Sequence, residues 1–480
     1  MIGLEYNDAA HLLRRMGFGG SPDEINSLAS KGRDGAVDYL LNYQSIDNSE
    51  MERILAESFE FPTSDDQKLL NQREISTWWI TRMVYTKRPF EEKLTLFWHH
   101  HFATALSKVK DFLMYVQNLT LRQYALSRFD ELVLKVSQDP AMLIWLDGVV
   151  NVKGAPNENF ARELQELFTL GIKDVVTGAE NYTEQDVKEI ARAFTGWEFK
   201  KKKDTSIYTY ESVVDASQHD NTAKTIYGQT ANFSGEDVIT IIANRRPTGR
   251  YLVYKLFNFF VYPLDLNSSA DKALIDKFAD VYFSTNHSMK ELLRAIFTSD
   301  EFFSNRARFA LIKTPIELVV GAVRMLQATY KPGTQEKGDR EQQLFRRAGY
   351  MGMELYNPPD VNGWDLHLGW VSTATMLERF NFANMLITER PKEKAVDSVS
   401  VSLEQLKANT KPSVKKTVSK FLEILGPLEV SSSAVKQLRK YLTLDDQGNA
   451  VAWVVTDDVV DKKVRGLVHQ IMCLPEFNLN

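Results

Sequence analysis

Near its middle the chain carries the stretch NENFARELQE, residues 157–166, whose side-chain spacing predicts a helix. Polar side chains at positions i, i+4 and i+7 share one helical face, and here they are Asn159, Glu163 and Glu166. Beside that row runs an apolar stripe made of Phe160, Leu164, Leu167 and Phe168. Carboxylates that border a buried stripe are either structural ions or parts of a functional site.

The same helical pattern recurs along most of the chain. A serine or threonine followed by an acidic residue in the first helical turn predicts helix starts at Ser21, Thr183, Ser234, Ser288 and Thr314. The helix that begins at Thr183 is expected to end with Gly196 at its C′ position, with a positive φ. The stretch from Trp197 to Tyr227 has little helical period and reads as a β-hairpin or an irregular excursion.

These patterns predict a mainly α fold, a large multi-helix unit with a small β-hairpin excursion. We expect a main helical domain over residues 1–389, with the β excursion near 198–230. Residues 390–480 are expected to form a Ser/Lys-rich linker and a C-terminal helical piece packed on the main domain.

Composition excludes several classes of protein. The 480 residues are 44% hydrophobic and carry a net charge of −5, which argues against broad nucleic-acid binding. Cys473 is the only cysteine, so an internal disulfide and a thiolate zinc cluster are excluded. No uninterrupted apolar run is long enough for a membrane helix. The first ten residues lack the apolar region of a signal peptide, so the chain as it stands is expected in the cytoplasm.

Glu163 and Glu166 are the best catalytic candidates on the central helix. A glutamate beside an apolar surface has a raised pKa and can serve as a general acid or base. Two such carboxylates with a histidine could instead bind a divalent metal ion. Arg162, four residues after Glu158, suits a surface ion pair or a substrate contact. The structural alternative is a network of the glutamates with arginines such as Arg192.

His99 and His101 are the candidate metal ligands. If the helix that begins at Pro89 continues through residues 97–102, FWHHHF, His101 points inward and His99 lies on another face. If the helix ends near Trp98 and the chain extends, the two histidines share a face and could hold half of a metal site. The alternative is a buried, hydrogen-bonded His101.

Two loops supply further candidates. His219 and Asp220, with Lys224 four residues on, could present a base, a ligand and a substrate contact, or could form a simple loop turn. In the second loop two prolines stiffen the backbone before Asn362, Trp364 and His367. Tryptophan on a stiff loop often lines a ligand pocket and stacks on sugar rings, although it can also anchor a loop that covers the core.

Nearly the whole chain resembles a large bacterial family, domain of unknown function 1800. The matching segments are 11–19, 97–102, 157–171, 182–187, 194–197, His219 to Gly228, 246–248, 313–315, 357–364, 379–383 and 474–477. The resemblance implies histidines at the positions of His99 and His101. Many relatives are exported and are encoded beside proteins resembling sulfatases or alkaline phosphatases, which implies envelope or extracellular polymer chemistry and an envelope-associated partner.

We hypothesise an enzyme in which His101, Glu163 and His219 meet in one pocket, with Glu166 and Asp220 as further catalytic groups. A metal-assisted hydrolase or lyase with a divalent ion, acting on a polar, glycan-like substrate, fits these residue types. The second hypothesis is a non-catalytic binding or assembly protein whose polar residues form buried structural networks. No Gly-x-Ser-x-Gly, Walker, His-Glu-x-x-His or dinucleotide-binding motif supports the commoner enzyme classes.

Overall fold

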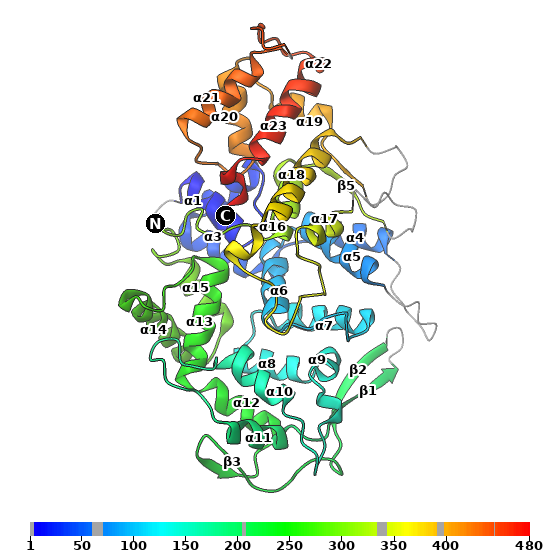
Figure 1. Cartoon of the computed structure of the whole chain (residues 1–480), viewed down its shortest axis with the longest axis vertical. Helices are drawn as coiled ribbons and strands as arrows, with labels where there is room; N and C mark the ends of the chain where they lie inside the picture. Colours follow the sequence, from blue (N-terminus) through cyan, green and yellow to red (C-terminus); the bar gives the residue numbers. More distant parts are fainter. Residues whose placement is uncertain (1–3, 60–70, 204–207, 334–342, 391–397, 446) are drawn as a thin grey trace.

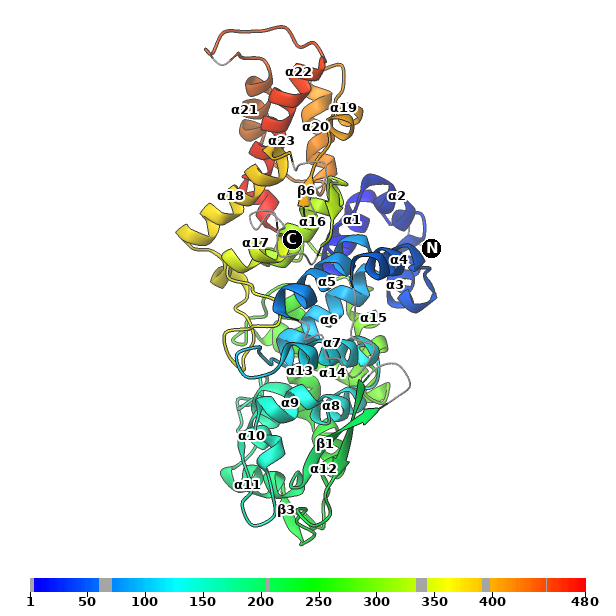
Figure 2. The same cartoon turned by 90° about the vertical axis from the view of Figure 1, so that its right-hand side faces the viewer.

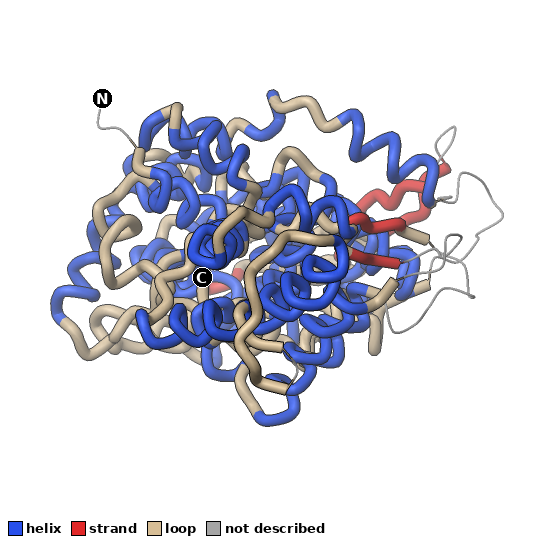
Figure 3. Tube along the Cα trace, turned by 90° about the horizontal axis from the view of Figure 1, so that it is seen from above, coloured by secondary structure: helices blue, strands red, loops and turns tan. Residues whose placement is uncertain are grey.

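The computed structural model describes residues 4–59, 71–203, 208–333, 343–390, 398–445 and 447–480. The molecule is elongated, with α20–α23 at one end of its long axis and α11 with strand β3 at the other (Figures 1 and 2). Both termini lie near the middle of that axis (Figures 1 and 2). Helices make up most of the described chain, which confirms the mainly α prediction (Figure 3).

The first half of the chain is mainly helical and includes a π-helix, η3 (Leu164–Thr169), between α10 and α11. Its helices are α1 (Tyr6–Arg15), α2 (Pro22–Ala29), α3 (Gly32–Leu41), α4 (Ser49–Ser58), α5 (Gln72–Tyr85), α6 (Pro89–His101), α7 (Asp111–Tyr124), α8 (Phe129–Ser137), α9 (Pro140–Trp145), α10 (Asn159–Glu163) and α11 (Glu184–Ala193).

The second half continues the helical pattern after a β excursion. Its helices are α12 (Gly235–Ala243), α13 (Arg246–Phe260), α14 (Ser269–Ser284), α15 (Met289–Phe297), α16 (Pro315–Met325), α17 (Leu344–Tyr350), α18 (Thr373–Thr388), α19 (Leu403–Asn409), α20 (Val414–Ile424), α21 (Ser432–Leu442), α22 (Asp457–Val459) and α23 (Arg465–Met472).

The β excursion is made of two antiparallel hairpins. One pairs β1 (Trp197–Lys203) with β2 (Tyr208–Val214), and the other pairs β3 (Lys224–Ile226) with β4 (Gln229–Ala231). A third pair joins β5 (Thr329–Lys331) to β6 (Ser398–Ser400), so the chain after residue 397 is tied back to an earlier segment. Residues 391–397 of the expected linker lie outside the described residues.

Capping residues set the helix starts that the sequence predicts. Capping boxes, in which the cap side chain and the third helical residue bond each other's backbone, occur at Ser21, Thr183, Ser234 and Thr314. Ser288 caps α15 by accepting a hydrogen bond from the Glu291 amide. The regular helix expected after Asn159 is wrong from Leu164 onward, where α10 passes into the π-helix.

Helix α6 runs through the core and is buried along its whole length. Its apolar residues belong to both hydrophobic clusters of the protein, one built on α1–α3, α6, α8 and α10–α15 and one on α5, α16–α21 and α23. Its buried charge Glu92 accepts bonds from Arg82 Nε at 3.0 Å and Arg122 Nη1 at 2.5 Å. Helices α5, α6 and α7 are therefore joined by a buried ionic network.

Candidate functional site

Glu163 and Glu166 lie close together where α10 passes into the π-helix, yet their surroundings differ. Glu163 is partly buried, and among the described residues it has no hydrogen-bond or ion-pair partner. Burial raises the pKa of Glu163, and the nearby Glu166 carboxylate raises it further. Glu166 Oε2 accepts a hydrogen bond from the Tyr182 hydroxyl at 3.0 Å. A π-helical segment is itself a frequent feature of functional sites.

Arg162 is engaged at the surface. Its guanidinium bonds Glu184 Oε1 at 2.7 Å and Glu158 Oε2 at 3.1 Å, which joins α10 to the first turn of α11. The i, i+4 pair with Glu158 is the one that the sequence predicts. A substrate contact for Arg162 stays a prediction, and such a contact would have to compete with two carboxylates.

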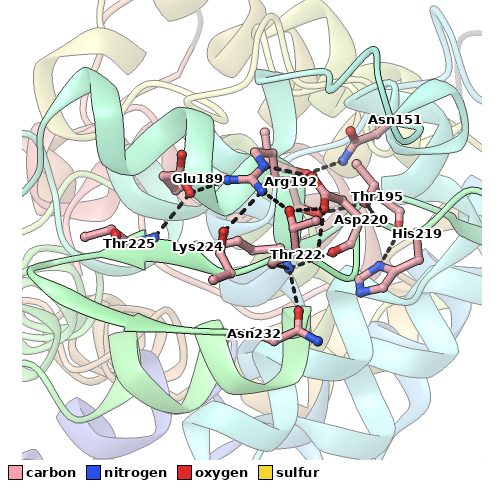
Figure 4. A network of polar contacts seen from close by, with 12 residues as sticks. Asn151, Glu189, Arg192, Thr195, His219, Asp220, Thr222, Lys224, Thr225 and Asn232 are labelled. Atoms are coloured by element: carbon pink, nitrogen blue, oxygen red, sulfur yellow. Dashed lines mark hydrogen bonds and ion pairs between the residues drawn. The ribbon is translucent and has the colours of Figure 1, made fainter.

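His219 and Asp220 are held by the end of α11 and the turn after it (Figure 4). His219 Nδ1 lies 2.8 Å from the Thr195 carbonyl oxygen. Asp220 Oδ2 accepts from Arg192 Nε at 2.8 Å, and its Oδ1 accepts from the Thr222 hydroxyl at 2.5 Å. The Arg192 hydrogen bond holds the pKa of Asp220 well below its ordinary value. The carboxylate is therefore a paired ion at neutral pH.

Lys224 is buried beneath the same loop and binds its backbone. It is 1% exposed, and its ammonium donates to the carbonyl oxygens of Asp220 at 2.7 Å and Thr222 at 3.0 Å. A third bond reaches Asn232 Oδ1 at 3.1 Å (Figure 4). Because its three donors are satisfied within the protein, the contacts of Lys224 hold the loop in its conformation.

His99 and His101 occupy different environments because α6 continues through His101. The His99 ring packs between aromatic side chains, with the Trp364 centroid at 5.4 Å. His101 Nε2 lies 2.9 Å from the Phe168 carbonyl oxygen in the π-helix. Burial lowers the pKa of each histidine to about 3, so both are neutral.

The helix contradicts the alternative in which His99 and His101 share a face as paired metal ligands. In the described ranges, histidine, cysteine, aspartate and glutamate side chains form no group of three or more that could hold a metal ion. His101 and His219 bond different backbone carbonyl oxygens, and in the described residues no hydrogen bond or ion pair joins either of them to Glu163. Their meeting in one pocket stays a prediction.

The loop at 357–367 packs directly on α6. The Trp364 amide donates to His100 Nδ1 at 3.1 Å, and a Cβ added at Gly363 would lie 2.4 Å from that same nitrogen. Gly363, with φ of +86°, is therefore required by both conformation and space. Trp364 is 4% exposed, and Asn362 is exposed at the turn. His367 is partly buried, and its pKa is lowered by burial and by repulsion from Arg15.

Lys255 is a site residue that the sequence analysis missed. It is partly buried without a hydrogen bond or ion pair among the described residues, and burial lowers its pKa. After burial, Lys255 is the next cause of the lowered pKa of both His100 and His101, so it faces α6. The sequence did contain an indication of this residue. Tyr251, Lys255 and Phe259 lie at positions i, i+4 and i+8 on one face of α13, so the lysine interrupts an aromatic stripe.

That stripe connects the two parts of the site. Lys255 Nζ lies 5.8 Å from the Tyr251 ring centroid, and Glu166 contributes to the raised pKa of Tyr251 after burial and Tyr254. At the other end the Phe259 ring stacks on His100 at 6.1 Å. One face of α13 thus leads from the carboxylates of the π-helix to the loop that bears Trp364.

The chain matches the family described as proteins of unknown function, DUF1800, over residues 11–479. Because the match covers nearly all of its length, the protein belongs to this family. No curated protein and no solved structure matches the chain. In the part of the chain that the structure describes, no helix is long and apolar enough to cross a membrane.

Proposed function

We propose that the protein is an enzyme that uses Glu163 as a general acid or base and Glu166 as a second carboxylate. The observation that carries the proposal is the contrast between the two: Glu163 is partly buried with a raised pKa and bonds none of the described residues, whereas Glu166 is hydrogen-bonded to Tyr182. Neighbouring titratable groups in unlike environments are the arrangement by which enzymes assign acid and base roles.

A polar, glycan-like substrate suits the side chains that flank the pair. Tyr182 and Tyr251 offer rings that stack on sugars, and each lies close enough to Glu166 for that carboxylate to influence its pKa. Lys255 provides a cation on the same face of α13, without an ion-pair partner in the described part of the chain. Hydrolysis and elimination both need an acid and a base, and two carboxylates can supply them. The proposal includes both reactions.

Metal assistance is a separate part of the proposal. A divalent ion would need a different ligand set from His99 with His101, because the two rings lie on different faces of α6. The carboxylates of Glu163 and Glu166 are the available oxygen ligands at the site.

The second candidate function is a non-catalytic binding or assembly protein. It is favoured by the network of Arg192, Thr195, His219, Asp220 and Lys224, in which the polar groups that suggested chemistry bond one another (Figure 4). If this function holds, substitutions in the network change stability without removing any reaction.

The test is an activity screen of the full chain on polysaccharides, scored both for new reducing ends and for unsaturated products. Glu163→Gln keeps the shape of the side chain and should lower turnover by roughly 10²–10⁴-fold while the protein stays folded. Glu236→Gln is the control, because Glu236 is an exposed carboxylate on α12 and should leave turnover unchanged. Equal turnover by the Glu163→Gln variant and the parent chain would refute the assignment.

A further inference from the structure

A second group of charges is buried around Glu317, at the start of α16. Four cationic side chains, each no more than 3% exposed, lie close enough to this carboxylate for it to influence their pKa values: Arg15, Lys93, Lys313 and Arg379. They come from α1, α6, the segment before α16, and α18. We call these five residues the Glu317 centre.

The Glu317 carboxylate is already occupied. Lys93 forms an ion pair with Oε1, and the Thr314 amide donates to Oε2 at 2.6 Å as part of the cap of α16. The four cations thus face a single carboxylate, and that carboxylate is bound to Lys93. Three positive charges are left over.

The remaining three cations bond main-chain oxygens, and Arg379 Nη1 also bonds the amide oxygen of Asn478 at 3.2 Å. Arg15 Nη2 donates to the Asn480 oxygen at 3.0 Å, Lys313 Nζ to Phe477 at 2.5 Å, and Arg379 Nη2 to Lys313 at 2.8 Å. In the described ranges none of the three has an ion-pair partner. A carboxylate at Asn480 would offset one charge and leave two. Buried charges are normally paired, because transfer from water is costly.

Several donors in the same region have no acceptor. Arg15 Nε and Nη1, Arg379 Nε and His367 Nε2 are buried and lack any hydrogen-bond partner in the described part of the chain. Burial lowers the pKa of Lys313 to about 7, with repulsion from Arg14 adding to the effect, and burial lowers that of Arg15 to about 9. Among the described residues the centre therefore has more positive than negative charge and more donors than acceptors.

We propose that the Glu317 centre binds a small oxyanion, phosphate or sulfate, either free or as the ester group of a larger molecule. Arginine forks match the oxygens of such anions in pairs, and Arg15 and Arg379 present the unused donors. His367 lies nearest to solvent among these groups, because it is partly buried and is followed by Leu368, which is 77% exposed.

The Glu317 centre is built on α1, α6, α16 and α18, whereas the carboxylates of the proposed enzyme lie on α10 and the π-helix, far from α16 and α18 (Figure 1). His367 has a positive φ of +56°, a conformation that a non-glycine residue keeps only when its surroundings hold it there. The loop thus holds a histidine beside Arg15, and binding of an anion would give the His367 ring and the two guanidinium groups a common partner.

The experiment is calorimetric titration of the full chain with inorganic phosphate, inorganic sulfate and methyl phosphate, at constant ionic strength set by chloride. We expect binding of at least one of these ions with one site per chain, and a melting midpoint above that in chloride alone. Binding of methyl phosphate alone identifies an ester group as the ligand, and binding of the inorganic ions alone identifies a free anion.

Two substitutions test whether the anion binds at the Glu317 centre. His367→Ala removes a partly buried ring whose Nε2 bonds none of the described residues, so the variant should fold, and Arg379→Lys keeps the charge but loses the fork. Each should weaken binding roughly tenfold or more, since each removes a hydrogen bond to a charged group. The matched controls His469→Ala on α23 and Arg294→Lys on α15 should bind as the parent chain does.

The proposal is overturned if phosphate, sulfate and methyl phosphate give no binding heat and no midpoint change relative to chloride. It is also overturned if His367→Ala binds the anion unchanged, because the site would then lie elsewhere. If Arg379→Lys fails to fold, His367→Ala decides alone. A cluster that served only to join α1, α18 and the C-terminal segment would give the first of these results.

Discussion

Glu163 and Asp220 are carboxylates in opposite environments. Burial and Glu166 raise the pKa of Glu163, so the fold disfavours its ionised form. The Arg192 hydrogen bond lowers the pKa of Asp220, so the fold favours its ionised form. The negative charge of Glu163 should therefore destabilise the folded protein, and the negative charge of Asp220 should stabilise it.

Glu163→Gln should leave the protein as stable as the parent chain, or more stable, near neutral pH. A carboxyl group with a raised folded pKa stabilises the fold while protonated, and that contribution is lost as the pH rises through the raised value. Glutamine has no charge to desolvate, so any gain should shrink as the pH falls toward about 4. Urea unfolding of both proteins across this range measures the difference.

Asp220→Asn is the opposing control. The ionised form of Asp220 stabilises the fold above its unfolded pKa, so this variant should be less stable than the parent at neutral pH and should converge with it in acid. Strong destabilisation of Glu163→Gln at neutral pH would mean that Glu163 also belongs to a structural network, and would favour the non-catalytic function.

At the scale of elements, Gly196 has the positive φ that the sequence predicts, but the prediction that it occupies the C′ position of α11 was wrong. Its φ is +79°, whereas α11 ends at Ala193 with Phe194 as C-cap, so Gly196 lies two residues beyond the cap rather than at C′. A Cβ there would lie 2.7 Å from the Asp215 carbonyl oxygen. The glycine lets β1 begin directly against the loop that carries His219.

Gly196→Ala should destabilise the protein by roughly 1 kcal/mol or more, through left-handed strain and the close approach to Asp215. Gly228→Ala is the matched control, because Gly228 has φ of +78° and open space around its Cβ position. Both variants carry the conformational strain, and the additional loss for Gly196→Ala measures the steric contact. Identical melting midpoints for the two variants would show that the 215–219 loop moves aside.

Local signals predicted the helices and hairpins well, because caps and periodicity act within a few residues. Ser21, Thr183 and Thr314 cap their helices as expected. The π-helix was not predicted, and its contact with a residue 67 positions away is not visible in the local sequence: the Phe168 carbonyl oxygen lies 2.9 Å from His101 Nε2. Lys255 was missed for a similar reason, because only the packing of α13 on α6 shows that it is buried without a partner among the described residues.

At the scale of the whole molecule, the hydrophobic clusters meet along α6, and this placement determines the state of its histidines. The sequence singled out His99 and His101, but residues 97–102 alone cannot show which helices cover each face. All three histidines of α6 are at most 4% exposed, and His11 on α1 is 0% exposed. Burial lowers the pKa of each of the four, so the folded protein holds them neutral.

This burial predicts a protein that is sensitive to mild acid. A histidine whose folded pKa is depressed takes up a proton on unfolding, so its contribution to stability is lost as the pH falls below about 6.5. Asp139, whose pKa burial raises to about 7, has the opposite effect: it releases a proton on unfolding, which cancels the proton uptake of one histidine. Glu91, whose pKa burial also raises, adds to this cancellation. The free energy of unfolding should fall on the order of 3 kcal/mol per pH unit between about pH 6 and pH 5.

His99→Phe tests how much one of these histidines contributes to the pH dependence of stability. The His99 ring packs against Trp79, Tyr356 and Trp364, and its Nε2 has no hydrogen-bond partner among the described residues, so phenylalanine fits the site chemically. The variant should reduce the pH slope by about 1.4 kcal/mol per pH unit, while Glu236→Gln keeps it. Urea unfolding at several pH values measures both slopes. An unchanged slope would mean that His99 is protonated in the fold, and then a bound anion or a solvent path must reach α6.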